Sequence, residues 1–206
     1  AGDLLKEASD VGLPMVAVGL FYRRGYFHQR LDPSGMQHEY WTVSAPGRLA
    51  IERVEDAGGA PLFVEVPLRS GAVRLAIYRA DVGRVPLFLL DSDVPSNGPV
   101  ERFITSQLYI GDPTYRLMQY VVGGLGAVRA LAAMGIAPAL YHLNEGHPAF
   151  AALELMREPL ARGEPLERVL ADVRRRVVFT THTPVAAGNE GYPVAQVEGV
   201  LAAFLR

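Results

Sequence analysis

The sequence predicts an α/β fold into which an antiparallel β-meander is inserted. An apolar run at 138–143 leads through a polar loop into helical spacing at 149–157, and a second apolar run at 177–179 ends in the polar cluster 180–184. Between positions 26 and 90 the hydrophobic period changes to two, as in strands. Because ligands bind outside the carboxyl ends of strands in parallel α/β sheets, the two polar loops are the first candidates for a functional site.

Composition narrows the protein class. Half of the 206 residues are apolar and the net charge is −2, so the chain can form a core and lacks the clustered cations of a nucleic-acid-binding protein. The basic run 174–176 falls where a helix should end, and cations there interact favourably with the helix dipole. The sequence has no cysteine and no apolar stretch of the roughly 20 residues that a membrane helix needs. We expect a cytoplasmic protein that binds neither nucleic acid nor a membrane.

Positions 1–25 predict a helix followed by a parallel strand. Helical spacing at 4–10 precedes Gly12, which suits a helix C-cap, and the apolar run 15–22 has the pattern of a buried parallel strand. The chain begins without methionine and without an earlier strand against which the helix could pack. We therefore expect a piece of a longer polypeptide.

Positions 26–90 predict the inserted meander. The sequence DPSG at 32–35 has Pro at the second and Gly at the fourth position of a type I turn, which indicates a hairpin between 27–31 and 37–43. Further strands are predicted at 49–54, 62–66, 73–78 and 86–90. The polar loop 91–99 closes the insertion.

Positions 99–206 return to α/β units. Helices are predicted at 101–109, at 117–131 with an end near Gly135, from about 148, at 165–176 and at 193–205. Glycines 123, 124 and 126 lie inside the second helix with no strand before them, so they predict close helix packing and give no support to a nucleotide-binding oxidoreductase. We expect one incomplete domain over 1–206, with parts 1–25, 26–90 and 99–206.

The two polar loops combine side chains that can both donate and accept hydrogen bonds. The candidates are Asn144, Glu145, His147, Thr181, His182 and Thr183. Sugar hydroxyls also donate and accept, so this set suits a polyhydroxylated ligand. The residues alone leave a second interpretation open, in which Asn144 and Thr181 cap the helices that follow and His147 only packs there.

Metal and serine-nucleophile chemistry are disfavoured. His142, His147 and His182 with Glu145 could assemble a zinc site, but no His-Glu-x-x-His pattern is present. His142 lies inside an apolar strand, where an isolated histidine is more often a hydrogen-bonded core group. No Gly-x-Ser-x-Gly elbow is present either. We expect no metal site.

Several sequence motifs along the chain are more informative about the protein family than the composition is. They are GLFYRRGYF at 19–27, LDSDV at 90–94, ITSQLY at 104–109, VRAL at 128–131, YHLNEGHPAF at 141–150 and FTTHTPVAAG at 179–188. Together they resemble the α-glucan (glycogen or maltodextrin) phosphorylases, in particular the shorter bacterial and archaeal type. The resemblance covers nearly the whole chain.

The resemblance implies a retaining glycosyltransferase that uses inorganic phosphate to release glucose 1-phosphate from the ends of α-1,4-glucans. It implies a partial Rossmann-like amino-terminal domain of a two-domain, GT-B type fold. The implied partners are an α-1,4-glucan or maltodextrin, inorganic phosphate and the missing carboxyl-terminal domain, and a homo-oligomer stays open. The implied cofactor, pyridoxal phosphate, belongs to the full-length parent, because the lysine that binds it lies in the absent domain.

By motif, the resemblance implies site residues. His182 would hold the 6-hydroxyl region of the glucose, and Glu145, the second catalytic candidate, could favour oxocarbenium character. The implied substrate-binding residues are Asn144, Asp112, Arg116, His147 and Thr183. Asp112 resembles the acidic residue of a gate loop, although Pro113 stands where longer family members carry asparagine.

Two departures limit what the piece could do alone. The glycine-rich segment that family members place before position 1 is absent, and so is the whole carboxyl-terminal domain. We expect the 206 residues by themselves to hold no cofactor and to be inactive. The alternative is a non-catalytic carbohydrate-binding or regulatory module that kept half of the architecture.

Overall fold

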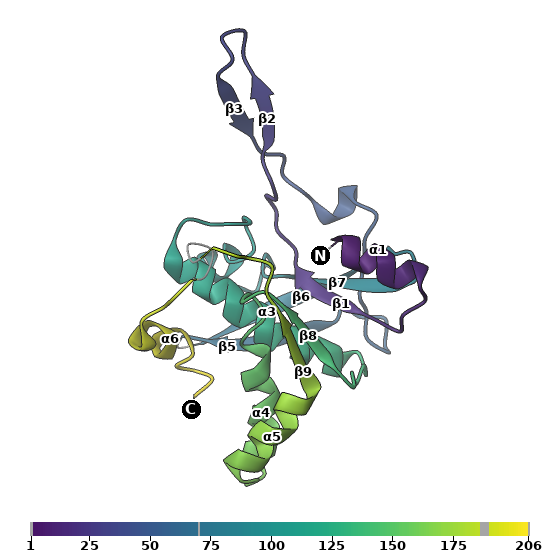
Figure 1. The fold of residues 1–206 in the computed structure, drawn as a ribbon, viewed down its shortest axis with the longest axis vertical. Helices are drawn as coiled ribbons and strands as arrows, with labels where there is room; N and C mark the ends of the chain where they lie inside the picture. The colour runs from purple at the N-terminus through teal and green to yellow at the C-terminus, as the bar shows by residue number, and fades with distance from the viewer. Residues whose placement is uncertain (1, 70, 186–189, 206) are drawn as a thin grey trace.

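The computed structural model describes residues 2–69, 71–185 and 190–205, which form a mixed α/β structure (Figure 1). The helices are α1 (Gly2–Asp10), α2 (Pro99–Arg102), α3 (Pro113–Ala133), α4 (Ala151–Ala161), α5 (Leu166–Arg176) and α6 (Val194–Val200), with a 3₁₀ turn η1 (Pro46–Arg48). The strands are β1 (Ala17–Leu20), β2 (His28–Leu31), β3 (Gln37–Tyr40), β4 (Glu52–Arg53), β5 (Phe63–Leu68), β6 (Gly71–Val82), β7 (Val85–Asp91), β8 (Tyr141–Asn144) and β9 (Val177–Thr180). The predicted α/β class is confirmed.

The largest sheet is mixed and has five strands. β1 runs parallel to β7, with Gly19 opposite Leu89, and β7 is antiparallel to β6. The long strand β6 also pairs antiparallel with β4 and β5 at different parts of its length. Alternate residues of β5, from Val64 to Leu68, are buried, which is the period of two that predicted the strand. The described part of the chain therefore combines the predicted parallel strand and most of the meander in one sheet.

Helix α3 packs on this sheet and carries much of the core. Its residues Leu117, Val121 and Leu125 are fully buried at the predicted helical spacing. The helix ends as predicted, with Gly135 at φ +72° in the left-handed region that glycine adopts readily. A long amphipathic helix thus fixes the position of the segments attached at either end of it.

The glycines of α3 serve packing, as predicted. A Cβ on Gly124 would lie 2.6 Å from the backbone nitrogen of Ala151, at the start of α4. A Cβ on Gly126 would lie 2.8 Å from a methyl carbon of Leu75 on β6. At Gly124 the neighbouring atoms belong to the backbone, so only a residue without a side chain permits this approach of α3 to α4. At Gly126 an added methyl group would force buried side chains of the sheet to shift.

Strands β8 and β9 form a separate two-stranded parallel sheet. The chain passes from β8 through α4 and α5 to β9, and Asn144 lies opposite Thr180 at the carboxyl ends. The parallel pairing that the sequence suggested is therefore present. In the described ranges no pairing joins these two strands to the larger sheet.

The predicted meander is also divided. The DPSG turn is confirmed, since the Gly35 amide donates to the Asp32 carbonyl at 3.0 Å, and β2 pairs with β3 as a hairpin. This hairpin, however, extends away from the body of the molecule (Figure 1). Every residue of β2 and β3 is exposed, so the hairpin has no buried face with which to join the larger sheet.

Two predicted helices are shorter than expected. The helix predicted at 101–109 ends at Arg102, because the Thr105 and Ser106 carbonyls accept hydrogen bonds from the amides of Arg23 and Arg24. These long-range bonds replace the helical ones. The helix predicted at 193–205 is regular only over α6 and then continues in turns. None of the described helices is long and apolar enough to cross a membrane.

Replacing Gly124 by alanine should destabilise the fold by roughly 1–3 kcal/mol, because the new methyl group would overlap the backbone at Phe150 and Ala151. Gly123→Ala is the matched control. Its Cβ would meet nothing closer than 3.9 Å, and alanine favours a helix by up to about 1 kcal/mol over glycine. Urea unfolding of both variants checks this. Equal stabilities for the two would contradict the packing role of Gly124.

Candidate functional site

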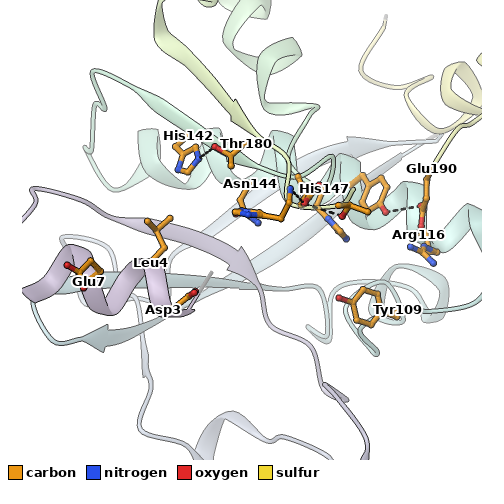
Figure 2. A pocket seen from close by; sticks show the side chains of 14 residues that line it. Asp3, Leu4, Glu7, Tyr109, Arg116, His142, Asn144, His147, Thr180 and Glu190 are labelled. Atoms are coloured by element: carbon orange, nitrogen blue, oxygen red, sulfur yellow. Dashed lines mark hydrogen bonds and ion pairs between the residues drawn. The ribbon is translucent and has the colours of Figure 1, made fainter. Parts of the chain in front are cut away.

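A pocket of about 1140 Å³ opens beside the carboxyl ends of β8 and β9 (Figure 2). Its lining comes from α1, from Tyr109 and the start of α3, and from β8, β9 and the loops that follow these two strands. The lining residues are Asp3, Leu4, Glu7, Tyr109, Arg116, Tyr120, His142, Asn144, Glu145, His147, Thr180, His182, Thr183 and Glu190. The described lining thus contains all of the predicted site residues except Asp112 and Thr181.

Glu145 joins the two loops. Its carboxylate accepts hydrogen bonds from the His182 amide, from the Thr181 hydroxyl at 3.3 Å and from the Thr183 hydroxyl at 3.2 Å. The His182 amide contributes most to lowering the pKa of Glu145, desolvation opposes it, and the hydroxyls of Thr183 and Thr181 add to the lowering. Glu145 is therefore a carboxylate at neutral pH and holds the loop of His182.

The backbone is strained at this pocket. Glu145 has φ +62° and Tyr109 has φ +56°, in the left-handed region that residues other than glycine seldom adopt. Such residues persist only where surrounding contacts hold them, and they cluster at functional sites. For Glu145 those contacts are the bonds across to the loop after β9, including its own amide to the Thr180 carbonyl at 2.9 Å.

His182 is oriented by Asn144. Nε2 of His182 lies 2.9 Å from Oδ1 of Asn144. With the amide in this orientation the oxygen accepts, so Nε2 carries the proton and Nδ1 of a neutral ring is left to accept a hydrogen bond. The capping interpretation is wrong, because α4 starts after Phe150 without a side-chain cap and Thr181 bonds to Glu145 instead.

His147 packs against α3. Its ring meets the Tyr120 ring edge-on, with centroids 4.7 Å apart. Partial burial lowers the pKa of His147 most, the nearby Arg116 guanidinium lowers it further, and Glu145 opposes both. His147 is therefore a neutral imidazole at neutral pH, able to donate one hydrogen bond and accept another.

His142 differs from its predicted environment. It is exposed and lines the pocket, with Nε2 2.7 Å from the Thr180 hydroxyl. The prediction of a core position is wrong, because His142 is an exposed residue of β8. Among the residues that the structure describes, no group of three or more His, Cys, Asp or Glu side chains could hold a metal ion.

Arg116 and Asp112 occupy different surroundings. Arg116 lines the pocket and forms an ion pair with Glu190. Asp112 is the N-cap of α3, where its carboxylate accepts from the amides of Thr114 at 2.8 Å and Tyr115 at 3.0 Å, and it is absent from the described pocket lining. A substrate-binding role for Asp112 stays a prediction.

Sequence reasoning missed several lining residues. Tyr120 could have been found, because it lies one helical turn after Arg116 and therefore on the same face of α3. No local sequence pattern indicated that Glu190 lies at the pocket, because only the fold brings it next to α3. The last part of the 179–188 motif, residues 186–188, lies outside the described residues.

The described lining does not fit pyridoxal phosphate. A Schiff base requires a lysine, and the single lysine of the sequence, Lys6, is not among the described lining residues. The one arginine in the lining, Arg116, is already paired with Glu190. The chemistry of these donors suits a neutral polyhydroxylated ligand better than a phosphorylated aldehyde.

No family model matches the chain, but comparison with known proteins finds phosphorylases among its relatives. Maltodextrin phosphorylase of Thermococcus litoralis is 43% identical over 205 residues, which cover 100% of this chain and 25% of that protein. Glycogen phosphorylase of Mycobacterium tuberculosis is 45% identical over 205 residues, 96% of this chain and 24% of that protein. Glycogen phosphorylase of Aquifex aeolicus is 35% identical over 198 residues, 96% of this chain and 29% of that protein.

The chain thus spans about a quarter of the length of the curated relatives it matches. The matches extend over all the motifs from which the resemblance was drawn, and the names of these relatives agree with it. They confirm that, over its whole length, this chain is homologous to a segment of the glycogen and maltodextrin phosphorylase family.

Proposed function

We propose that this chain supplies the sugar-binding side of the active site of an α-glucan phosphorylase. The complete enzyme would be a retaining glycosyltransferase that uses inorganic phosphate to release glucose 1-phosphate from the ends of α-1,4-glucans. The observation that carries the proposal is the contact between Glu145 and the loop of His182, which the parallel pairing of β8 and β9 produces at the edge of the pocket. The names of the relatives support the substrate class.

The proposed roles follow from charge and hydrogen-bonding capacity. The neutral His147, Nδ1 of the His182 imidazole and the Thr183 hydroxyl would bind sugar hydroxyls, which both donate and accept. Asn144 would act by orienting His182. The carboxylate of Glu145 would favour positive charge that develops on the glucose ring. With its lowered pKa, Glu145 would not serve as a general acid at neutral pH.

The remainder of the proposal concerns the rest of the polypeptide. The parallel β8–β9 unit with its two helices would be part of a Rossmann-like amino-terminal domain, facing a second such domain in a GT-B type fold. Residues outside this chain would hold pyridoxal phosphate, whose phosphate group supplies acid/base chemistry when bound. On this proposal the 206 residues alone are inactive, and the complete enzyme is cytoplasmic.

His182→Ala and Glu145→Gln, each made in the complete polypeptide, should lower kcat/KM for phosphorolysis of maltoheptaose by about 10²–10³-fold, because each removes a group placed against the sugar. Pyridoxal phosphate absorbance should persist in both. His38→Ala, on the exposed hairpin, is the control and should leave activity unchanged. Wild-type activity in both site variants would refute the assignment, and a complete polypeptide that binds maltodextrin without turnover would favour the carbohydrate-binding module.

The pKa of Glu145 should rise when Thr181 and Thr183 are both replaced by valine, because two hydrogen bonds to the carboxylate are lost. It should stay below the usual glutamate value, since the His182 amide remains. A depressed folded-state pKa means that the stability Glu145 contributes is complete above its unfolded-state pKa and is lost as the pH falls through the folded-state pKa. Carbon-13 NMR titration of the carboxyl group measures this shift, and identical titrations in both proteins would contradict it.

Asp112 can be tested for two separate roles. Asp112→Asn keeps a side-chain acceptor at the N-cap, whereas Asp112→Ala removes it and should cost about 1 kcal/mol of stability. If Asp112 also binds substrate through its charge, the asparagine variant should raise KM for maltodextrin several-fold at unchanged stability. Unaltered kinetics in a stable asparagine variant would leave Asp112 only as a cap.

A further inference from the structure

Three side chains converge on Glu190 at one end of the pocket. The Tyr120 hydroxyl donates to its carboxylate at 2.8 Å, the Tyr192 hydroxyl donates to the same oxygen, and the Arg116 guanidinium pairs with the other oxygen. Figure 2 shows Glu190 beside Arg116 at the pocket. The side chains of Arg116 and Glu190 are 28% and 25% exposed, so solvent screens this pair less than a surface ion pair.

The carboxylate connects two walls of the pocket. Arg116 and Tyr120 lie one turn apart on α3, whereas Glu190 belongs to the segment between β9 and α6. That segment also carries His182, whose amide donates to the Glu145 carboxylate. Glu190 and Glu145 therefore attach the same stretch of chain to two different parts of the structure.

The same network reaches His147. The Tyr120 ring, whose hydroxyl is bound by Glu190, contacts the His147 ring edge-on at 4.7 Å between centroids. Fixing Tyr120 therefore restricts the imidazole as well. The Arg116 guanidinium therefore contacts this carboxylate directly, and the His147 imidazole is linked to it through the Tyr120 side chain.

Arg116 requires such a partner to act on a neutral ligand. A free arginine side chain samples many rotamers and attracts anions, whereas a paired one presents its remaining N–H donors in a fixed direction with its charge balanced. Arg116 lines the pocket while paired, so donors not used by Glu190 can face a sugar hydroxyl.

We propose that Glu190 is the positioning residue of the sugar site, which fixes Arg116 and Tyr120 so that Arg116 serves as an oriented hydrogen-bond donor to the glucan. This inference rests on the proposed function, because it assumes that the pocket binds a glucan. Glu190 acts through Arg116 and does not itself take part in the reaction. Because Glu190 would contribute to binding of the glucan, its replacement should change mainly KM.

The test is a double-mutant cycle in the complete polypeptide, with Glu190→Gln, Arg116→Gln and the double variant, measured as KM and kcat for maltoheptaose. Glu190→Gln should raise KM by about tenfold with kcat changed less than about threefold, because a charge-assisted contact is lost. In the Arg116→Gln background the same change should raise KM by less than about twofold. Equal effects in both backgrounds, or no effect in either, would overturn the inference.

Two further variants make the result unambiguous. Tyr192→Phe removes one donor to Glu190 and should raise KM in the same direction by a smaller factor, which keeps a test available if Glu190→Gln fails to fold. Glu158→Gln, which breaks the exposed pair with Arg162 at 3.0 Å, should change neither constant. An unchanged KM in a folded Tyr192→Phe variant, when Glu190→Gln does not fold, would count against the inference. A different result would be wild-type activity in His182→Ala and Glu145→Gln while the effect of Glu190→Gln on KM still depends on Arg116. That result would refute the proposed sugar-binding role of His182 and Glu145 rather than the role of Glu190.

Discussion

The pairing of β8 with β9 is the constraint on which the pocket depends. Asn144 and Thr180 lie opposite each other at the ends of these strands, so every residue that follows in either loop starts from a fixed separation. The carboxylate of Glu145 then closes the gap by accepting the His182 amide and the neighbouring hydroxyls. Since Glu145 achieves this only with a left-handed backbone, hydrogen bonds across the strand ends offset a local strain.

Helix α3 gives the pocket its other wall. Close packing against α4 and the larger sheet holds the helix through glycines and fully buried aliphatic residues. This packing also fixes the backbone of the amino-terminal part of α3. Its polar residues Arg116 and Tyr120 contact Glu190, in the segment after β9. Packing far from the pocket is therefore what makes an oriented arginine feasible there. Rigid elements generally position polar groups more accurately than loops do.

Local patterns predicted local structure well, and tertiary contacts decided the rest. The strands β8 and β9, the helix α3 and the turn at Asp32 all follow from periods and turn residues that neighbours in sequence specify. The early end of α2 depends on amides of Arg23 and Arg24, which no window around that helix contains. In the candidate site, too, some residues are recognisable from local sequence and others only from tertiary contacts. The motif residues Glu145 and His182 could be named from the sequence, whereas Glu190 reaches α3 only through the fold.

The order of the chain between β8 and β9 has a consequence for how this region folds. The two strands can pair only when the chain between them, which contains α4 and α5, turns back. Closing such a long connection costs chain entropy before the few contacts of two four-residue strands repay it. The pocket should therefore be among the last features to appear during folding and among the first to open under mild denaturation, while α3 and the larger sheet persist.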